Sequence, residues 1–414
     1  TLESGPKMVG NTFNSPQNPF GLHSDKHYIT FDNTATDPIM YICTDGGVAR
    51  TTDEDLSRYK DLNTGLISTQ FFAIDADING RIIGGTQDNN TMILTGESFP
   101  RNPGSAILGG DGFECEISEF NPDILFGESQ YGNLRRSLTG GASMSSIWDN
   151  RISASLATGR PTSYFNNPFC LWEDPVIVDS VKTYGPAEGL DSTIDARLYF
   201  ATNDGIWMCQ NALSGAFEPN VNKDGGIRWF RISDLNATVK FLEHSKDGNT
   251  LYATTTNGRI YKIENLLTAN FDTAAIENNK YDGIEASLVT TNITGNLGAN
   301  GRAVTSIAID DSNPDRAVVT VGNYGNTNYV YVTNNLTSAT PTWTSIQGNL
   351  PRFPVYHAVI SMEDPDVIIL GTEFGVWKFH GKQTGWTEVR SGDADQPDAI
   401  PSIVARDGTN NGAW

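Results

Sequence analysis

The sequence predicts an all-β fold, a seven-bladed β-propeller with four-stranded antiparallel blades, and three observations support this prediction. A unit of short apolar strands returns seven times along the chain. Most units place Asp, Asn or Pro in the turn after the first strand, and a Gly-rich polar turn after the second strand. No long segment has the apolar spacing of a helix. Four short strands per unit at this spacing are typical of propeller blades.

The seven units cover most of the chain. Their second strands, such as AVVTV at 317–321 and VIILG at 367–371, are rich in Val and Ile, which suits strands buried between neighbouring blades. We expect a single domain over residues 1–414, with 391–414 as a C-terminal extension or as the segment that closes the ring. The expected blades span roughly 22–62, 66–100, 108–150, 165–233, 236–294, 300–348 and 352–390.

The order of the strands predicts which turns lie together. If the first strand of each blade runs away from one end, here called the top face, then the turn after the second strand and the links between blades return to that end. We call the opposite end the bottom face. Loops at one end of a rigid scaffold are where binding groups usually lie, so we expect the functional residues on the top face.

Composition excludes some classes of function. The 414-residue chain has a formal net charge of -21, and an acidic surface repels a phosphate backbone, so we expect no nucleic-acid partner. No apolar stretch approaches the roughly 20 residues of a membrane helix, so we expect a protein that does not span a membrane. The four cysteines have no C-x-x-C spacing. We expect free thiols, with a disulfide between Cys115 and Cys170 as the alternative.

Several phrases, taken in order, resemble one known group. They include HSDKHYITFD at 23–32, TDGGVARTTDE at 44–54, GGDGFECEISEFNPDILFGESQYGN at 109–133 and GNLPRFPVYHAVI at 348–360. On these phrases the chain resembles the exported Asp-box, sortilin-like β-propellers common in Bacteroidota. The resemblance implies a protein that is secreted or lies on the outer cell surface of a bacterium. It also implies carriage by a type IX secretion system and an outer-membrane anchor.

The same broad group includes endo-xyloglucanases, whose base is an aspartate in a phrase like T-D-x-G-G-x-Y-R. TDGGVAR at 44–50 places Asp45 near this position, although the phrase is one residue shorter and lacks the tyrosine. The resemblance therefore implies Asp45 as a candidate base. A glycosidase also needs a second carboxylate roughly 5–9.5 Å from the first. Asp111 and Glu373 are the candidates on the expected top face.

His23, Asp25 and His27 form a possible metal site, because two of the five histidines flank an aspartate within five residues. Alternate positions of a strand share one face, and two imidazoles with one carboxylate are suitable ligands for zinc or another transition ion. The alternative is that these groups form hydrogen bonds with the neighbouring backbone.

DADING at 75–80 matches the first half of a calcium loop, with Asp75, Asp77 and Asn79 as oxygen ligands. The position of the bidentate glutamate is taken by Thr86. Because the same residues are good turn formers, an ordinary hairpin turn is the alternative to a calcium site.

The expected top-face turns also offer groups suited to a sugar or a peptide, because flat rings and amides can contact both. In GGDGF at 109–113, three glycines surround Asp111, which either faces a ligand at the channel mouth or caps a tight crossing. The residues expected to bind a ligand are Gln87, Asp88, Tyr131, Asn323, Tyr324, Arg352 and Phe374.

The function expected from these features is a secreted or cell-surface, non-catalytic binding or adhesion module that recognises a glycan or protein ligand through its top face. Two alternatives remain. One is a glycoside hydrolase of endo-xyloglucanase type with Asp45 as base. The other is a structural part of a longer secreted protein. Fold likeness alone does not choose among them, because function depends on the site.

Overall fold

The computed structural model confirms the all-β, seven-bladed architecture. The described residues form seven four-stranded antiparallel sheets and no helix. In each sheet the strands neighbour one another in chain order, so every sheet is a four-stranded meander. The described residues are 22–23, 25–34, 39–51, 59–63, 69–94, 104–147, 164–177, 192–203, 205–210, 212–213, 229–235, 237–271, 284–381 and 385–389.

The strands of the first three sheets are β1 (Lys26–Asp32), β2 (Ile39–Thr44), β3 (Gly47–Thr51), β4 (Lys60–Asp61); β5 (Phe71–Ala76), β6 (Ile82–Thr86), β7 (Thr91–Leu94), β8 (Ser105–Leu108); and β9 (Gly112–Ile117), β10 (Leu125–Ser129), β11 (Asn133–Ser137), β12 (Ser145–Ser146). Those of the fourth and fifth sheets are β13 (Phe169–Ile177), β14 (Ser192–Thr202), β15 (Gly205–Cys209), β16 (Trp229–Ser233); and β17 (Val239–His244), β18 (Thr250–Thr255), β19 (Ile260–Glu264), β20 (Val289–Asn292). Those of the last two are β21 (Val304–Asp310), β22 (Asn313–Val321), β23 (Val330–Thr333), β24 (Thr344–Ser345); and β25 (Val355–Ile360), β26 (Val367–Thr372), β27 (Gly375–His380), β28 (Trp386–Val389).

The blade bounds and the single domain expected from the sequence stay predictions. β8 (Ser105–Leu108) completes the second sheet, although the expected second blade ends near residue 100. The expected C-terminal segment 391–414 lies outside the described residues. All four cysteines are free thiols, so the alternative of a Cys115–Cys170 disulfide is wrong.

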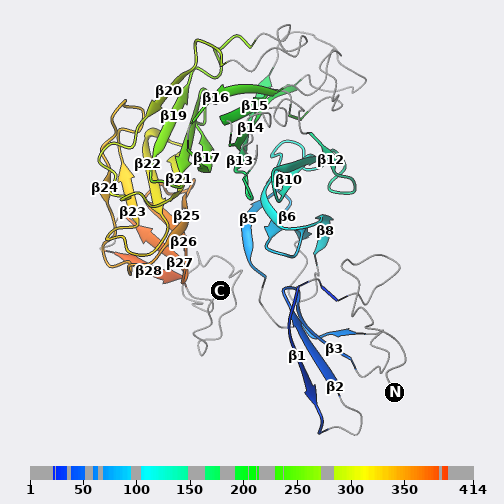
Figure 1. Ribbon diagram of the computed structural model, residues 1–414. Coiled ribbons are helices and arrows are strands. Elements are labelled where there is room, and N and C mark those ends of the chain that lie inside the picture. Colours follow the sequence, from blue (N-terminus) through cyan, green and yellow to red (C-terminus); the bar gives the residue numbers. More distant parts are fainter. Residues whose placement is uncertain are drawn as a thin grey trace.

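Six of the sheets stand side by side in an arc (Figure 1). Their first strands succeed one another along its inner side, because β5 contacts β9, β9 contacts β13, and so on through β17 and β21 to β25. The apolar cores lie between these sheets. One core cluster, for example, joins Leu198 and Trp229 of the fourth sheet to Phe126 and Leu134 of the third. Burial of such faces is the main favourable contribution to the packing of blades.

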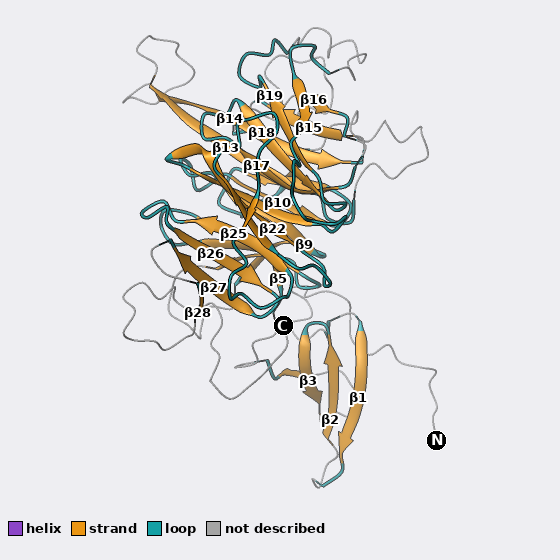
Figure 2. Cartoon of the chain, turned by 90° about the vertical axis from the view of Figure 1, so that its left-hand side faces the viewer, coloured by secondary structure: helices purple, strands orange, loops and turns teal. Residues whose placement is uncertain are grey.

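The first sheet stands apart from the other six in both views (Figures 1 and 2). Its small core of Leu22, Met40, Ile42 and Tyr59 includes no residue of another sheet. Tyr28 on β1 is 64% exposed, and Ile29 and Phe31 are exposed as well, whereas a first strand packed between two blades would have its apolar side chains covered. The first sheet is therefore joined to the second mainly through loops.

An irregularity recurs where the first strand of a sheet pairs with the second. In the first sheet Lys26 pairs with Thr44, but Tyr28 pairs with Cys43, so β1 carries one extra residue. The same shift occurs in the second, third, fifth, sixth and seventh sheets. A β-bulge bends a strand and changes the direction of its side chains. These bulges therefore lie at the top end of the first strands, where they change the direction of the side chains.

A threonine closes the turn after the second strand in several sheets. The hydroxyl of Thr372 donates to the carbonyl of Gly375 at 2.7 Å, and that of Thr86 donates to Asn90 at 2.6 Å. Gly375 has a φ of 88°, in the left-handed region where glycine carries no steric penalty. The repeated small residue and Gly-rich turn in the sequence thus have a local structural cause.

Candidate functional site

The top face holds most of the residues that the sequence singles out. They lie in turns between second and third strands or in links between sheets, which all return to this end. In order along the chain these are His23, Asp45, Gln87, Asp88, Asp111, Tyr131, Asn323, Tyr324, Arg352, Glu373 and Phe374.

Three aspartates meet where the first three sheets adjoin, and we call Asp45, Asp88 and Asp111 the carboxylate cluster. The backbone amide of Asp88 donates to the Asp111 carboxylate at 2.9 Å. The Asp45 carboxylate pairs with the imidazole of His27. Burial, followed by the negative charges of Asp111 and Asp45, raises the pKa of Asp88. The cluster therefore favours a proton, or another positive group, near Asp88.

His23 and His27 contact different partners. The imidazole of His23 donates to the main-chain oxygen of Asp88 at 2.6 Å, whereas His27 pairs with Asp45. Asp25 has a left-handed backbone with a φ of 56°. Among the described residues no group of three His, Cys, Asp or Glu side chains is placed to hold a metal ion. The structure thus places the two histidines in hydrogen bonds, and metal binding by His23, Asp25 and His27 stays a prediction.

The calcium-like residues at the bottom hairpin of the second sheet point in separate directions. Asp77 accepts the backbone amides of Asn79 and Arg81 at 2.8 and 2.9 Å and pairs with the Arg81 guanidinium at 3.0 Å. Asp75 accepts the amide of Ile117 from the next sheet at 2.6 Å. Asp77 therefore caps the hairpin turn and Asp75 bonds to the next sheet, while calcium binding by Asp75, Asp77 and Asn79 stays a prediction.

The sixth and seventh sheets form an aromatic patch, which we call the Tyr324 patch. It consists of Tyr324, Tyr356 and Phe374, which are 58%, 49% and 45% exposed, beside the carboxylate of Glu373. The hydroxyl of Tyr356 donates to Glu373. Burial, followed by the hydrogen bond with Glu373, raises the pKa of Tyr356. The patch therefore presents exposed ring faces next to a hydrogen-bonding carboxylate.

Two contacts fix the position of the Tyr324 patch. Phe374 packs edge-on against Phe353, with ring centroids 5.5 Å apart. The guanidinium of Arg302 donates to the main-chain oxygen of Tyr324 at 3.0 Å. These contacts position the loops on which Tyr324 and Phe374 lie.

A second aromatic row lies on the top face of the second to fourth sheets. Tyr131 packs edge-on against Phe165 at 5.4 Å, Phe165 against Phe113 at 5.2 Å, and Phe113 against Phe72 at 4.8 Å. Tyr131 has a φ of 67°, followed by Gly132 at 74°. Two successive positive φ values match a type I′ hairpin turn, and a tyrosine there is unusual. The turn holds Tyr131 exposed at its tip.

Three expected ligand-binding residues are placed on the top face without joining these groups. Asn323 has a left-handed backbone with a φ of 61° beside Tyr324. Arg352 is exposed just before β25. The main-chain oxygen of Gln87 accepts a hydrogen bond from the side-chain amide of Asn89 at 2.9 Å.

The inner side of the first strands carries carboxyl groups, of which the sequence-based expectations named only Asp75, and that as a calcium ligand. They are Asp75 on β5, Glu114 and Glu116 on β9, Glu173 on β13 and Glu243 on β17. Burial is the first cause that raises the pKa of each of them, to about 7 for Glu114 and about 8 for Glu243. The channel is therefore acidic in composition yet partly protonated at neutral pH.

Two of these carboxylates join neighbouring sheets. Besides the bond from Asp75 to Ile117, Glu173 accepts the hydroxyl of Ser118 at 2.5 Å and the amide of Glu119 at 2.8 Å. The end of β9 is thus bonded on both sides. In GFECEI the acids Glu114 and Glu116 alternate with apolar residues. Alternate residues of a strand share one face, so this pattern is the signal in the sequence that predicts acids facing the channel.

Comparison with known proteins identifies no family for the chain. No protein-family model matches the chain, and no curated protein matches it. Among solved structures, YCF48 from Cyanidioschyzon merolae is similar at 12% identity and a TM-score of 0.44, over 87% of this chain and 97% of that one. The β-propeller domain of Cps50 (Swd1) from Myceliophteria thermophila is similar at 10% identity and 0.47, over 84% and 93%. An ancestral GH74 enzyme is similar at 14% identity and 0.49, over 78% of this chain and 38% of the enzyme.

The seven four-stranded sheets agree with the propeller part of the resemblance, while its Asp-box, sortilin-like and Bacteroidota parts stay expectations. In the part of the chain that the structure describes, no helix is long and apolar enough to cross a membrane.

Proposed function

We propose that the protein is a non-catalytic binding module that recognises a glycan through its top face. The observation that carries this proposal is the Tyr324 patch, where three exposed rings adjoin the carboxylate of Glu373. Sugar rings present apolar faces that stack on aromatic side chains, and hydroxyl groups that a carboxylate accepts. A water-exposed group of aromatic side chains has little structural role of its own.

Local backbone conformation supports the same face. Tyr131 and Asp88 on neighbouring top turns have left-handed φ values of 67° and 59°. Non-glycine residues in this region cost of order 1–3 kcal/mol each and gather at binding sites, because the surrounding structure must hold them. The left-handed Tyr131 is exposed rather than buried. We therefore place it in the same proposed binding face.

A polysaccharide panel tests the proposal. The full chain is run by affinity gel electrophoresis through soluble polysaccharides, xyloglucan included, and on a glycan array. We expect Tyr324→Ala and Tyr356→Ala each to weaken binding about tenfold, the usual effect of removing a central aromatic contact. Phe120→Ala is the matched control, because Phe120 is also exposed but lies in the turn between β9 and β10 on the bottom face. Equal binding by all three variants, or no glycan bound at all, contradicts the proposal.

A glycoside hydrolase is the second candidate, and the carboxylate cluster favours it. Glycosidases pair a carboxyl group of raised pKa, which acts as the acid, with a second carboxylate. Asp88, whose pKa is raised, lies with Asp45 and Asp111 at one end of the sheets. In this candidate Asp45 acts as base and Asp88 as acid.

Product formation decides between the two candidates. Polysaccharide digests are separated by chromatography after incubation with the wild-type chain and with Asp45→Ala. Product from the wild type that disappears in Asp45→Ala supports the hydrolase. Binding without product supports the binding module.

Location is proposed from the sequence resemblance alone. We propose a secreted or outer-surface protein of a bacterium, exported by a type IX secretion system, in which this propeller is one part of a longer chain. This location is measured directly by the accessibility of the protein to protease on intact cells that express the gene.

A further inference from the structure

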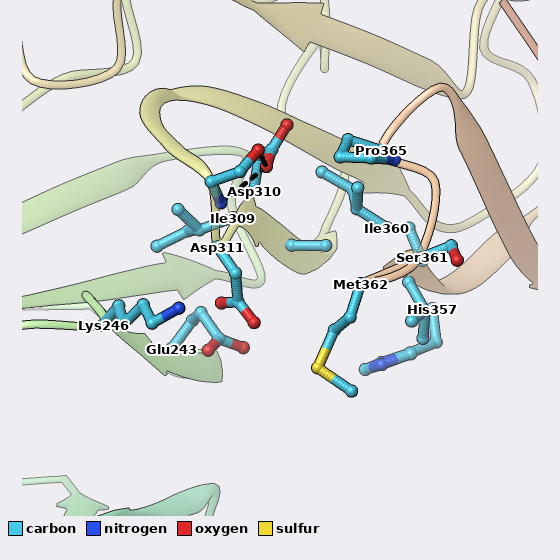
Figure 3. Close-up of a pocket in the computed structure, with 14 residues that line it drawn as sticks. Glu243, Lys246, Ile309, Asp310, Asp311, His357, Ile360, Ser361, Met362 and Pro365 are labelled. Carbon is cyan, nitrogen blue, oxygen red and sulfur yellow. Dashed lines mark hydrogen bonds between the residues drawn. The ribbon is translucent and has the colours of Figure 1, made fainter. Parts of the chain in front are cut away.

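A cavity of about 420 Å³ opens on the bottom face, where the channel-side strands β17, β21 and β25 end (Figure 3). Glu243 comes from β17, Asp311 from the turn after β21, and His357 from β25. Met362 follows β25 on the bottom turn. This site lies at the opposite end from the proposed glycan site and does not depend on it.

The two sides of the cavity differ in chemistry. The carboxylates of Glu243 and Asp311 lie on one side with Lys246, and Met362 and His357 lie on the other (Figure 3). Met362 is 83% exposed and Val359, which also lines the cavity, is 49% exposed. Burial lowers the pKa of His357, so its imidazole is neutral at pH 7. One side therefore carries most of the titratable groups, and the other is largely uncharged.

The two carboxylates have no cation of their own. Among the described residues no ion pair joins Lys246 to Glu243 or to Asp311. Asp310, by contrast, is held by Arg316 at 2.9 Å. Glu243 is partly buried and points into the cavity, and the backbone of its neighbour His244 is a hydrogen-bonding partner. A partly buried carboxylate without an ion pair favours a positively charged ligand when it is ionised.

Two features distinguish the class of cation. A calcium ion takes six to eight oxygen ligands, and the described residues contain no group of three acidic or imidazole side chains placed around a metal. An uncharged wall gives a bare ion nothing to contact, whereas it can cover a hydrocarbon chain. We propose that this cavity binds a primary alkylammonium ion, with its ammonium group between Glu243 and Asp311 and its carbon chain against Val359 and Met362.

Binding is coupled to a proton. Burial, followed by the Asp311 charge, raises the pKa of Glu243 to about 8, so this carboxyl is largely protonated at pH 7. An arriving ammonium favours the ionised form and releases the proton, and an alkylammonium itself stays charged below about pH 10. Affinity therefore rises as pH rises from 6.5 to 8.5. The titratable groups that surround Glu243 are Asp311, Lys246, His357, Glu116, Cys170 and Asp310, the last paired with Arg316.

Isothermal titration of the full chain with n-hexylammonium tests the proposal, with hexanoate, hexanol and calcium as comparison ligands. We expect n-hexylammonium to bind, several-fold more tightly at pH 8.5 than at 6.5, and hexanoate and hexanol not to bind. Methylammonium should bind about tenfold more weakly, because it lacks the chain that covers Val359 and Met362. Proton release, measured in buffers of different ionisation enthalpy, should accompany binding at pH 7.

Two carboxamide variants locate the site. Glu243→Gln and Asp311→Asn should each weaken n-hexylammonium binding about tenfold, and Glu243→Gln should also abolish the pH dependence. Asp311 is exposed in a turn, so Asp311→Asn keeps the test valid if Glu243→Gln fails to fold. Glu363→Gln is the matched control, since Glu363 adjoins Met362 but does not line the cavity. Equal binding of hexanoate, tighter binding of calcium than of n-hexylammonium, or unchanged affinity in Asp311→Asn overturns the proposal.

Discussion

The imidazole of His23 lies 2.6 Å from the main-chain oxygen of Asp88, and this hydrogen bond crosses from the first sheet to the second. The side-chain amide of Asn89 donates to the main-chain oxygen of Asp45 at 3.1 Å in the same place. No apolar core cluster joins the two sheets in the described residues. Loop contacts on the top face are therefore the main attachment of the first sheet.

Removal of the His23 contact should loosen the first sheet selectively. We expect His23→Ala to raise hydrogen-exchange rates of β1 to β3 roughly fivefold, because a hydrogen bond contributes about 1 kcal/mol. Gly46→Ala should act likewise, since an added Cβ would lie 2.8 Å from the His23 side chain. Exchange mass spectrometry measures both, with His380→Ala on the seventh sheet as control. Equal acceleration across all seven sheets would contradict this.

The separate core of the first sheet predicts two unfolding transitions. Ile42 is fully buried, but only among residues of its own sheet. Phe126 is also fully buried, but in a core that joins the third and fourth sheets. We expect Ile42→Ala to shift only the weaker transition in a denaturant titration, and Phe126→Ala to shift the stronger one by about 3–5 kcal/mol. A single transition that moves equally in both variants would show that the first sheet is packed against its neighbours.

The channel carboxyls predict that stability falls as pH rises. The pKa of Glu114 is about 7 in the folded chain against 4.5 for a free side chain, because burial disfavours its charge. The folded state therefore holds a proton that the unfolded state has released, so this stability is fully present below pH 4.5 and is lost up to about pH 7. The loss is at most about 3 kcal/mol for this group. Unfolding free energies measured between pH 5 and 8 should decline, and Glu114→Gln should flatten the decline.

Two strand glycines without positive φ differ in what surrounds them. A Cβ at Gly85 would lie 1.9 Å from the carbonyl oxygen of Phe113 in the next sheet, whereas a Cβ at Gly127 would be in ordinary contact at 3.5 Å or more. We expect Gly85→Ala to destabilise the protein by more than about 3 kcal/mol, since backbone must move. Gly127→Ala should be tolerated or slightly stabilising. The melting temperatures of the two variants provide the measurement; a tolerated Gly85→Ala would argue against the close approach of β6 and β9.

Much of the fold follows from local patterns in the sequence. The seven units, their strand order and their turns were predictable, because alternation and Gly-rich turns depend on residues close in the chain. The grouping of the predicted site residues was only partly predictable. Asp45, Asp88 and Asp111 were each singled out, but their meeting depends on how the first three sheets adjoin, which no local pattern records. The Tyr356–Glu373 contact was missed for the same reason.

The sequence by itself determined the all-β architecture, the four-stranded sheets and the end of the molecule at which the polar turns lie. These depend on side-chain periodicity and turn chemistry, which act over a few residues. Only the tertiary structure decided that the first sheet stands apart, that Glu243 and Asp311 share one side of a cavity, and that the carboxyls of the first strands have raised pKa values. Burial and the proximity of charges depend on strands far apart in the chain, and these set the pKa values and the exposed faces.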